Sequence, residues 1–164
     1  MRRVEMDIRE ATSKELNTIA MLIRESNKDV ALKFGINAEN CPRHPSFCTD
    51  DWVRTDFARG EKYFILEEEA KTIGCVAYET PSAGLAYLNR LSVLPAHRNR
   101  SAGARLVQHI IQHAKSELIQ KISIGVIAEH AELQRWYRAL GFKAGETKQF
   151  QHLPFAVTYM SYTL

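Results

Sequence analysis

The sequence predicts an α/β fold with a mixed β-sheet, because segments with strand periodicity alternate with segments of helical periodicity. The strongest helical pattern runs from about 101 to 116, and the segment 85–93 is a long strand that Pro95 ends. The segment 119–128 is apolar and β-branched, which is typical of a buried central strand. One face of the long helix carries five apolar residues, Leu106, Val107, Ile110, Ile111 and Ala114.

The first sixty residues predict a strand and three helices. A strand over 7–11 precedes Thr12–Glu15, whose spacing of hydroxyl and carboxylate is that of a capping box for a helix. A second, short helix would end at Gly35, and 40–45 reads as a loop. Residues 49–51 can cap a further helix that Gly60 closes.

The rest of the chain predicts a sheet with two more helical connections. Strands over 62–68 and 73–80 are joined by a polar segment, 69–72, in the outline of a hairpin, and a turn over 81–84 follows. After the strand 119–128, a helix over 129–140 would end at a glycine cap, Gly141. The last strand, 157–164, alternates in the way that strands do.

Size and composition indicate a soluble protein with one domain over residues 1–164. The net charge of +3 is too small to argue for nucleic acid, and no apolar segment suits a signal peptide or a membrane span. Three cysteines do not make a disulfide framework. We therefore expect a reduced, cytoplasmic protein that contacts neither nucleic acid nor a membrane.

The segment from Arg98 to Ala104 is the candidate ligand site. Small residues at the start of a helix allow a ligand close to the backbone, and the unpaired N–H groups there favour a diphosphate. Residues 90–105 contain four arginines and no acidic residue. The plain alternative is a helix start with solvated arginines. A P-loop would need the sequence Gly-Lys-Ser/Thr, and a dinucleotide-binding fold would need three spaced glycines. This segment contains neither pattern.

Two motifs resemble those of the GCN5-related N-acetyltransferase (GNAT) family. The run Leu91-Ser92-Val93-Leu94-Pro95-Ala96-His97-Arg98-Asn99-Arg100-Ser101-Ala102-Gly103-Ala104 is similar to the acetyl-CoA signature Arg/Gln-x-x-Gly-x-Gly/Ala, with Arg98 and Gly103 at matching positions. Ser101 stands where the family has its first glycine. The run Trp136-Tyr137-Arg138-Ala139-Leu140-Gly141-Phe142 is similar to Leu-Tyr-x-x-Leu-Gly-Phe.

The resemblance implies a GNAT-like fold, a mixed central sheet of about six or seven strands flanked by helices. It also implies that two central strands splay apart and admit the pantetheine of acetyl-CoA. The pantetheine would pair with the backbone of Leu91 and Val93, on either side of Ser92. The N–H groups of Arg98, Asn99, Arg100, Ser101, Ala102, Gly103 and Ala104 would then hold the diphosphate. An N–H near Val93 would polarise the thioester carbonyl.

For catalysis, the resemblance implies direct attack by a neutral amine and a general acid, Tyr137, that protonates the departing thiolate. The alternative for Tyr137 is a core aromatic beside Trp136. No carboxylate lies on 85–91, so we expect ordered water to remove the proton, with Glu79, Glu129 and His130 as the nearest alternatives. His130 stands where the family often has an asparagine beside the cofactor, and it could instead cap a helix.

The acceptor is expected to be a small-molecule primary amine, because the long segment between the first helix and the second strand could enclose one. The resemblance implies that residues 37–51 border the acceptor pocket, and 150–155 either folds over the acceptor or forms an ordinary loop. A protein or peptide substrate is the alternative, and a homodimer is compatible with the resemblance. Cys41, His44 and Cys48 are too irregularly spaced for a closed zinc site, so we expect no metal. A second class of function is a non-catalytic acyl-CoA sensor. The lack of a carboxylate on 85–91 and the presence of Ser101 favour this alternative, whereas the presence of Tyr137 argues against it.

Overall fold

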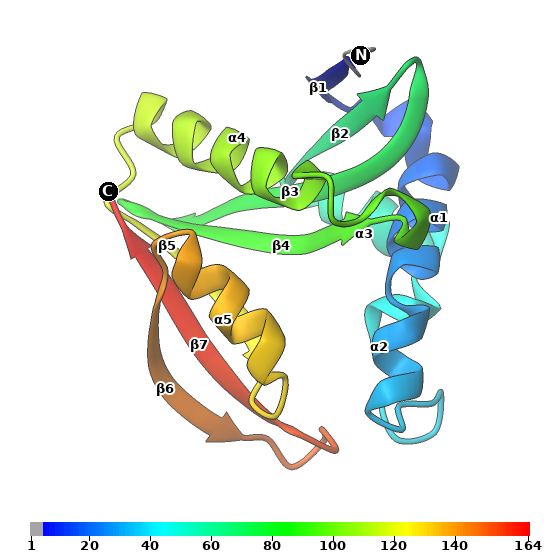
Figure 1. Ribbon diagram of the computed structural model, residues 1–164, viewed down its shortest axis with the longest axis vertical. Coiled ribbons are helices and arrows are strands. Elements are labelled where there is room, and N and C mark those ends of the chain that lie inside the picture. Colours follow the sequence, from blue (N-terminus) through cyan, green and yellow to red (C-terminus); the bar gives the residue numbers. More distant parts are fainter. Residues whose placement is uncertain (1–4) are drawn as a thin grey trace.

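The computed structural model describes residues 5–164 and contains one mixed sheet of seven strands within that range. Figure 1 shows the sheet with helices on both faces. The strand order is β1-β2-β3-β4-β5-β7-β6, with β4 and β5 parallel and the other neighbours antiparallel. The elements are β1 (Met6–Glu10), α1 (Leu16–Ser26), α2 (Lys28–Lys33), α3 (Asp50–Ala58), β2 (Lys62–Glu68), β3 (Lys71–Ser82), β4 (Leu85–Val93), α4 (Ala102–Ser116), β5 (Lys121–Ile127), α5 (Ala131–Ala139), β6 (Lys143–Gln149) and β7 (Ala156–Thr163).

The helix caps predicted from the sequence are present. Thr12 and Glu15 form the reciprocal capping box, although the first turn is a 3₁₀ helix and α1 itself begins at Leu16. Thr49 caps α3 by accepting a hydrogen bond from the amide of Trp52. The predicted α/β class is confirmed.

The hairpin between β2 and β3 is tighter than predicted. Glu68 pairs with Lys71, so the connection has two residues, Glu69 and Ala70, where the sequence suggested four. Both have positive φ, 49° and 67°, as a type I′ turn requires. The usual Asn-Gly sequence of such a turn is absent, which is why the pattern gave no indication of it. The prediction of the turn over 81–84 was similarly too long, because β3 continues to Ser82.

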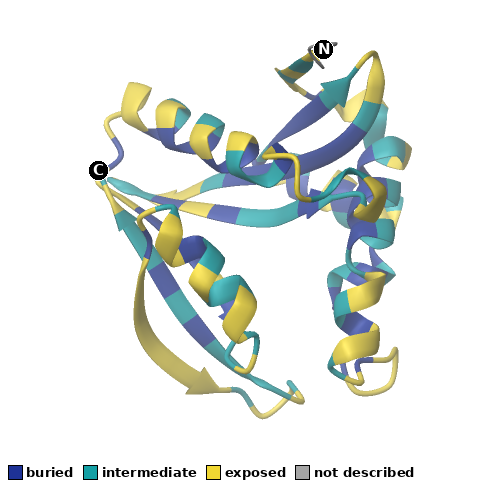
Figure 2. Cartoon of the chain, in the orientation of Figure 1, coloured by how far each residue is buried: buried dark blue, intermediate teal, exposed yellow. Residues whose placement is uncertain are grey.

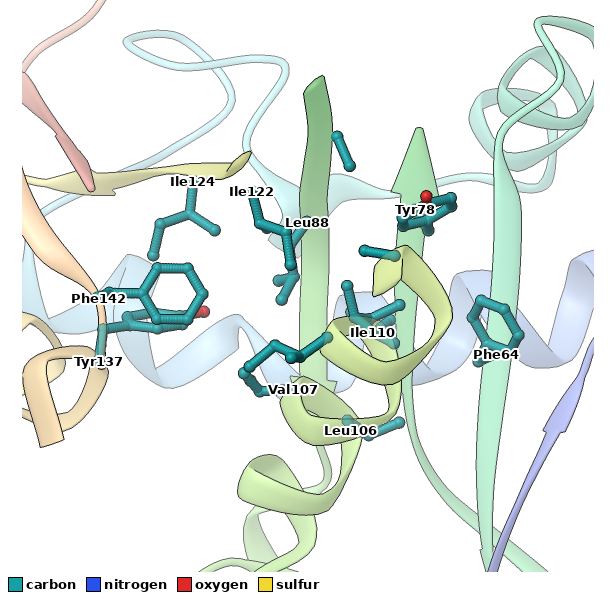
Figure 3. Packing of buried hydrophobic residues seen from close by; sticks show 14 of the residues in the cluster. Phe64, Tyr78, Leu88, Leu106, Val107, Ile110, Ile122, Ile124, Tyr137 and Phe142 are labelled. Atoms are coloured by element: carbon teal, nitrogen blue, oxygen red, sulfur yellow. The ribbon is translucent and has the colours of Figure 1, made fainter. Parts of the chain in front are cut away.

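Two hydrophobic clusters lie on opposite faces of the sheet, and a third, smaller cluster lies near Ile127 at the end of β5. One cluster joins the β2–β4 face to α4 and α5 and includes Phe64, Leu88 and Phe142, as Figure 3 shows. The second joins the opposite face to α1 and α3. Figure 2 shows buried residues lining the inner sides of α4 and α1, whereas β6 is exposed along its length.

The third cluster lies on the α1 face of the sheet and joins the α2 region to the loop before β7. It includes Ala31, Ile36 and Cys41, with Ile127 and Phe155 packed against them. Within residues 5–164, no helix combines the length and apolar character that crossing a bilayer requires.

Candidate functional site

Strands β4 and β5 separate after three residue pairs. Leu85, Ala86 and Tyr87 pair with 121–123, and no pair between these strands follows among the described residues. Beyond Tyr87 and Ser123 the strands diverge, and Figure 1 shows β5 and β7 turning away from β4 to give a V. Backbone groups that would otherwise pair across a sheet are therefore open to a ligand in this gap.

A β-bulge in β4 lies beside the gap. Cys75 pairs with Ser92 and Ala77 with Asn89, so β4 has one extra residue over this span. Arg90 lies in the bulge with φ of +51°, which is unusual for a residue with a side chain. Its guanidinium donates to Asp56 Oδ2 at 3.1 Å and lies 5.8 Å from the Trp52 ring. Contacts with α3 thus hold the bulge in place.

The backbone after the bulge faces the gap at Val93. The amide of Leu94 donates to Ile73 on β3 at 2.9 Å, and successive residues of a strand present their groups to opposite edges, so the N–H of Val93 points away from β3. The carbonyl of Val93 is already bonded to Arg98 Nε at 3.1 Å. Ser92 Oγ donates a hydrogen bond of 3.0 Å to the carbonyl of Arg90, so this hydroxyl stabilises the bulge.

The loop before α4 presents a run of free amides. Among the described residues, the N–H groups of 99–104 have no hydrogen-bond acceptor, and the first amide with one is that of Arg105, which donates to Ser101. Asn99 and Ser101 have φ of +63° and +68°, the left-handed conformation that glycine adopts without strain. Such an arrangement at a helix N-terminus is suited to a diphosphate.

The side chain of Arg98 anchors this loop to α1 and α2. Besides Val93, it donates to the carbonyl of Ser26 at 2.5 Å and to the carboxylate of Asp29 at 2.5 Å. Burial would raise the pKa of Asp29, but the hydrogen bond and the charge of Arg98, together with nearby backbone amides, lower that pKa overall. The amide of Arg98 donates to Pro95 at 3.3 Å. Arg98 therefore positions the loop with both its side chain and its backbone already bonded to protein atoms.

Arg100 and Arg105 differ in whether their charge is already paired within the protein. Arg100 is tied back to Glu68 at 2.8 Å and to His97 at 2.7 Å. Arg105 is exposed on the first turn of α4 and makes no ion pair among the described residues. Arg105 is therefore the arginine of this segment whose charge is available to an anion at the helix start.

Gly103 lies against Trp136, so the end of the first motif contacts the start of the second. A Cβ at Gly103 would come within 3.1 Å of Trp136 Cζ2. The sequence predicted that a small residue at position 103 admits a ligand. The structure adds that Trp136 leaves little room for a side chain there. On either side of Gly103, Ala102 is buried and Ala104 is half-buried. The indole of Trp136 therefore borders the region between α4 and α5 next to the free amides.

Tyr137 is 5% exposed and packs between Trp136 and Phe142, with ring centroids 5.0 and 5.3 Å away. Its hydroxyl has no hydrogen-bond partner within residues 5–164. Figure 3 shows the hydroxyl directed away from α5, toward the side of Leu88 and Val107. Burial raises the pKa of Tyr137, so the phenol keeps its proton at neutral pH.

His130 is the N-cap of α5, where its Nδ1 accepts a hydrogen bond of 3.4 Å from the amide of Leu133. The ring lies 5.2 Å from that of Phe34, and burial lowers the pKa of His130. The structure thus places His130 in the capping position, one of the two alternatives that the sequence left open.

The remaining candidates lie apart. Cys41 packs in the cluster of the α2 region and Cys48 in that of α1 and α3, and His44 bonds to Ser46 at 2.8 Å. Asp50 and Asp51 occupy the first turn of α3, as cap residues do. Glu79 lies 3.8 Å from Arg59 in an ion pair, and Glu129 is exposed.

A pocket of about 760 Å³ opens on the face of the sheet opposite α4 and α5. It begins where β4 and β5 part, and its lining includes Tyr87, Asn89, Ser123, Gly125, Tyr159 and Ser161. Sequence reasoning missed Asn89 because it searched β4 for a carboxylate. The alternation of β4 was the available indication, since buried Ala86 and Leu88 place Tyr87 and Asn89 on the other face.

Comparison with known proteins identifies the family. The model of the acetyltransferase (GNAT) family matches residues 21–142. Comparison with curated proteins finds no match. The solved structures that resemble the chain include the PaiA N-acetyltransferase of Thermoplasma acidophilum in complex with coenzyme A, with a TM-score of 0.81, 19% identity, and coverage of 98% of this chain and 99% of that one.

Two further structures have the same fold. The ribosomal-protein-S18-alanine N-acetyltransferase of Escherichia coli has a TM-score of 0.78 at 13% identity, covering 97% of this chain and 94% of that one. A phosphinothricin acetyltransferase of Sinorhizobium meliloti in complex with acetyl-CoA has a TM-score of 0.74 at 16% identity, covering 97% and 88%. The family model spans most of the chain and includes both motifs. The chain therefore belongs to the acetyltransferase (GNAT) family of acetyl-CoA-dependent acyltransferases.

Proposed function

We propose that residues 1–164 form one N-acetyltransferase domain that transfers the acetyl group of acetyl-CoA to a small primary amine. The observation that carries this proposal is the run of free amides at 99–104 beside the gap between β4 and β5. A diphosphate on these amides would lie at one end of the gap, and the pantetheine arm could then continue along β4. Structures of the same fold were solved with coenzyme A or acetyl-CoA, which supports this assignment.

The residues around the gap supply the groups that acyl transfer needs. The N–H of Val93 faces the gap and would polarise the thioester carbonyl. As the amine nitrogen bonds to the carbonyl carbon and the C–S bond breaks, Tyr137 would give its hydroxyl proton to the departing sulfur. The amine loses one proton to water, and a proton from water restores the phenol of Tyr137. This path agrees with the absence of a carboxylate on β4 from Leu85 to Val93.

The pocket on the opposite face would hold the acceptor. It meets the gap at Tyr87 and Ser123, so an amine there would approach the thioester from the side opposite α4. A volume of about 760 Å³ lies within the range of about 300–1,000 Å³ common for small-molecule sites. This volume favours a small amine over a protein N-terminus. The three cysteines are buried free thiols, which fits the reducing cytoplasm that we propose as the location.

One experiment tests the assignment in two stages. Calorimetry with coenzyme A on the folded protein should detect binding, and acetyl-CoA with a panel of primary amines should release free thiol that depends on the amine. Tight binding without thiol release for any amine would favour an acyl-CoA sensor. No affinity for coenzyme A or its thioesters would contradict the proposal.

A further inference from the structure

The side chain of Asn89 is fixed at the point where β4 leaves β5. It is the first residue on the pocket face beyond the last strand pair, Tyr87 with Ser123, and it lines the pocket. Asn89 Nδ2 donates a hydrogen bond of 3.0 Å to Glu61 Oε1. The other branch of the amide, Oδ1, has no hydrogen-bond partner among the described residues. An acceptor atom is therefore left for the pocket.

Glu61 determines which end of the amide remains free. Its side chain is 1% exposed, and its second oxygen accepts a hydrogen bond of 2.8 Å from Arg59. A carboxylate only accepts hydrogen bonds, so it must face the NH₂ of Asn89 and not the oxygen. Burial raises the pKa of Glu61, and the bond from Asn89 opposes this by favouring the charged form. The Glu61–Arg59 pair thus orients Asn89 without itself reaching the pocket.

The charges of the pocket favour an uncharged amine. Its charged lining residues are Lys121, Lys148 and Glu146, and Glu146 is 3.7 Å from Lys148. Asp56 does not line the pocket, and its carboxylate already accepts hydrogen bonds from Arg59, Tyr63 and Arg90. An ammonium ion would therefore find no unpaired carboxylate among the lining residues, whereas a neutral amine needs only an acceptor for one N–H.

We propose that Asn89 Oδ1 binds an N–H of the acceptor amine in its neutral form, and that Glu61 is a positioning residue that holds the amide in this orientation. The inference rests on the proposed acetyltransferase function. Asn89 is then a residue of β4 that orients the amine, and it takes the place of a carboxylate that would remove a proton from the amine. Because an amide is not a base, ionisation of the amine itself then limits the reaction at low pH.

The test uses n-butylamine and benzylamine as probes with acetyl-CoA. Asn89→Ala should raise KM for either amine about tenfold, the effect of one hydrogen bond, with the affinity for coenzyme A unchanged. Glu61→Gln should do the same, because the glutamine turns its own NH₂ away from Arg59 and toward Asn89, whose amide then flips. The control is Glu67→Gln, at the opposite end of β2 where Glu67 pairs with Arg9, and KM should not change.

The pH dependence separates positioning from a base. In the wild type, kcat/KM should rise with pH along the ionisation of each amine, at a higher pH for n-butylamine than for benzylamine. An inflection that is common to both amines and lost in Glu61→Gln would overturn the inference in favour of Glu61 as a base. An unchanged KM in Asn89→Ala would also overturn it. If the wild type neither binds coenzyme A nor releases thiol, the proposed function itself fails.

Discussion

Arg90 Nε donates a hydrogen bond of 3.1 Å to Asp56 Oδ2, and this ion pair joins the bulge of β4 to α3. The Asp56 side chain is 3% exposed and that of Arg90 20%. Asp56 also accepts hydrogen bonds from Tyr63 at 2.6 Å and Arg59 at 3.1 Å. A bulge next to the gap is therefore held by a buried carboxylate with three donors, which offsets the cost of the left-handed conformation of Arg90.

Asp56→Ala should lower the free energy of unfolding by about 3 kcal/mol, because it leaves the half-buried Arg90 and the buried hydroxyl of Tyr63 without their shared partner. The matched control is Asp51→Ala on the same helix, where an exposed pair with Arg54 should contribute less than about 1 kcal/mol. Urea unfolding measures both. Equal losses in the two variants would mean that the buried pair does not support the bulge.

Tyr137→Phe should reduce kcat by about 10²-fold or more while leaving the affinity for coenzyme A unchanged, because it removes the proton donor and keeps the packing. Tyr162→Phe is the control, since Tyr162 packs against Phe142 on the same side of the sheet. Thiol release and calorimetry give the two quantities. A kcat close to that of the wild type would show that Tyr137 is only a core aromatic.

The order of elements was readable from the sequence because the apolar periodicity of the long segments is strong. The helix α4 and the strand β4 appear almost at their predicted bounds. β6 was not given bounds, because all seven of its residues are exposed and no alternation marks it. The two-residue turn at Glu69 was missed because its residues lack the usual turn chemistry.

The site was only partly predictable, for a physical reason that Arg98 and Asn89 illustrate. A motif fixes which residue types stand near the helix start, but it does not show that the Arg98 side chain bonds to Ser26 and Asp29 on other elements. Asn89 became a candidate through Glu61, 28 residues earlier in the chain. Such tertiary partners leave no periodic pattern in the sequence.

Ser101→Gly should stabilise the protein by about 0.5–1 kcal/mol, because glycine adopts φ of +68° without the strain that a Cβ brings. Ser116→Gly at the other end of α4 is the control and should destabilise by about 0.5–1 kcal/mol, since glycine is unfavourable within a helix. Thermal unfolding measures the two shifts. A lower melting temperature for Ser101→Gly would contradict the assigned strain. Coenzyme A affinity should be kept, because the free amides remain.

The part of the stability that His44, His109 and His130 contribute should fall as the pH is lowered from 7.5 to 5.5. Burial lowers the pKa of His44, His109 and His130 in the folded state, so between the folded values and the unfolded value of about 6.5 the unfolded chain binds more protons. Stability contributed by these residues is therefore complete above about pH 6.5 and is lost as the pH falls below it.

His130→Asn isolates one of these contributions, because asparagine can still cap α5 but does not titrate. The urea midpoint of this variant should depend less steeply on pH than that of the wild type, while the two agree within a few tenths of a kcal/mol at pH 7.5. If the two pH dependences have the same slope, His130 is protonated as readily in the folded protein as in the unfolded chain, and its capping hydrogen bond through Nδ1 does not persist in solution.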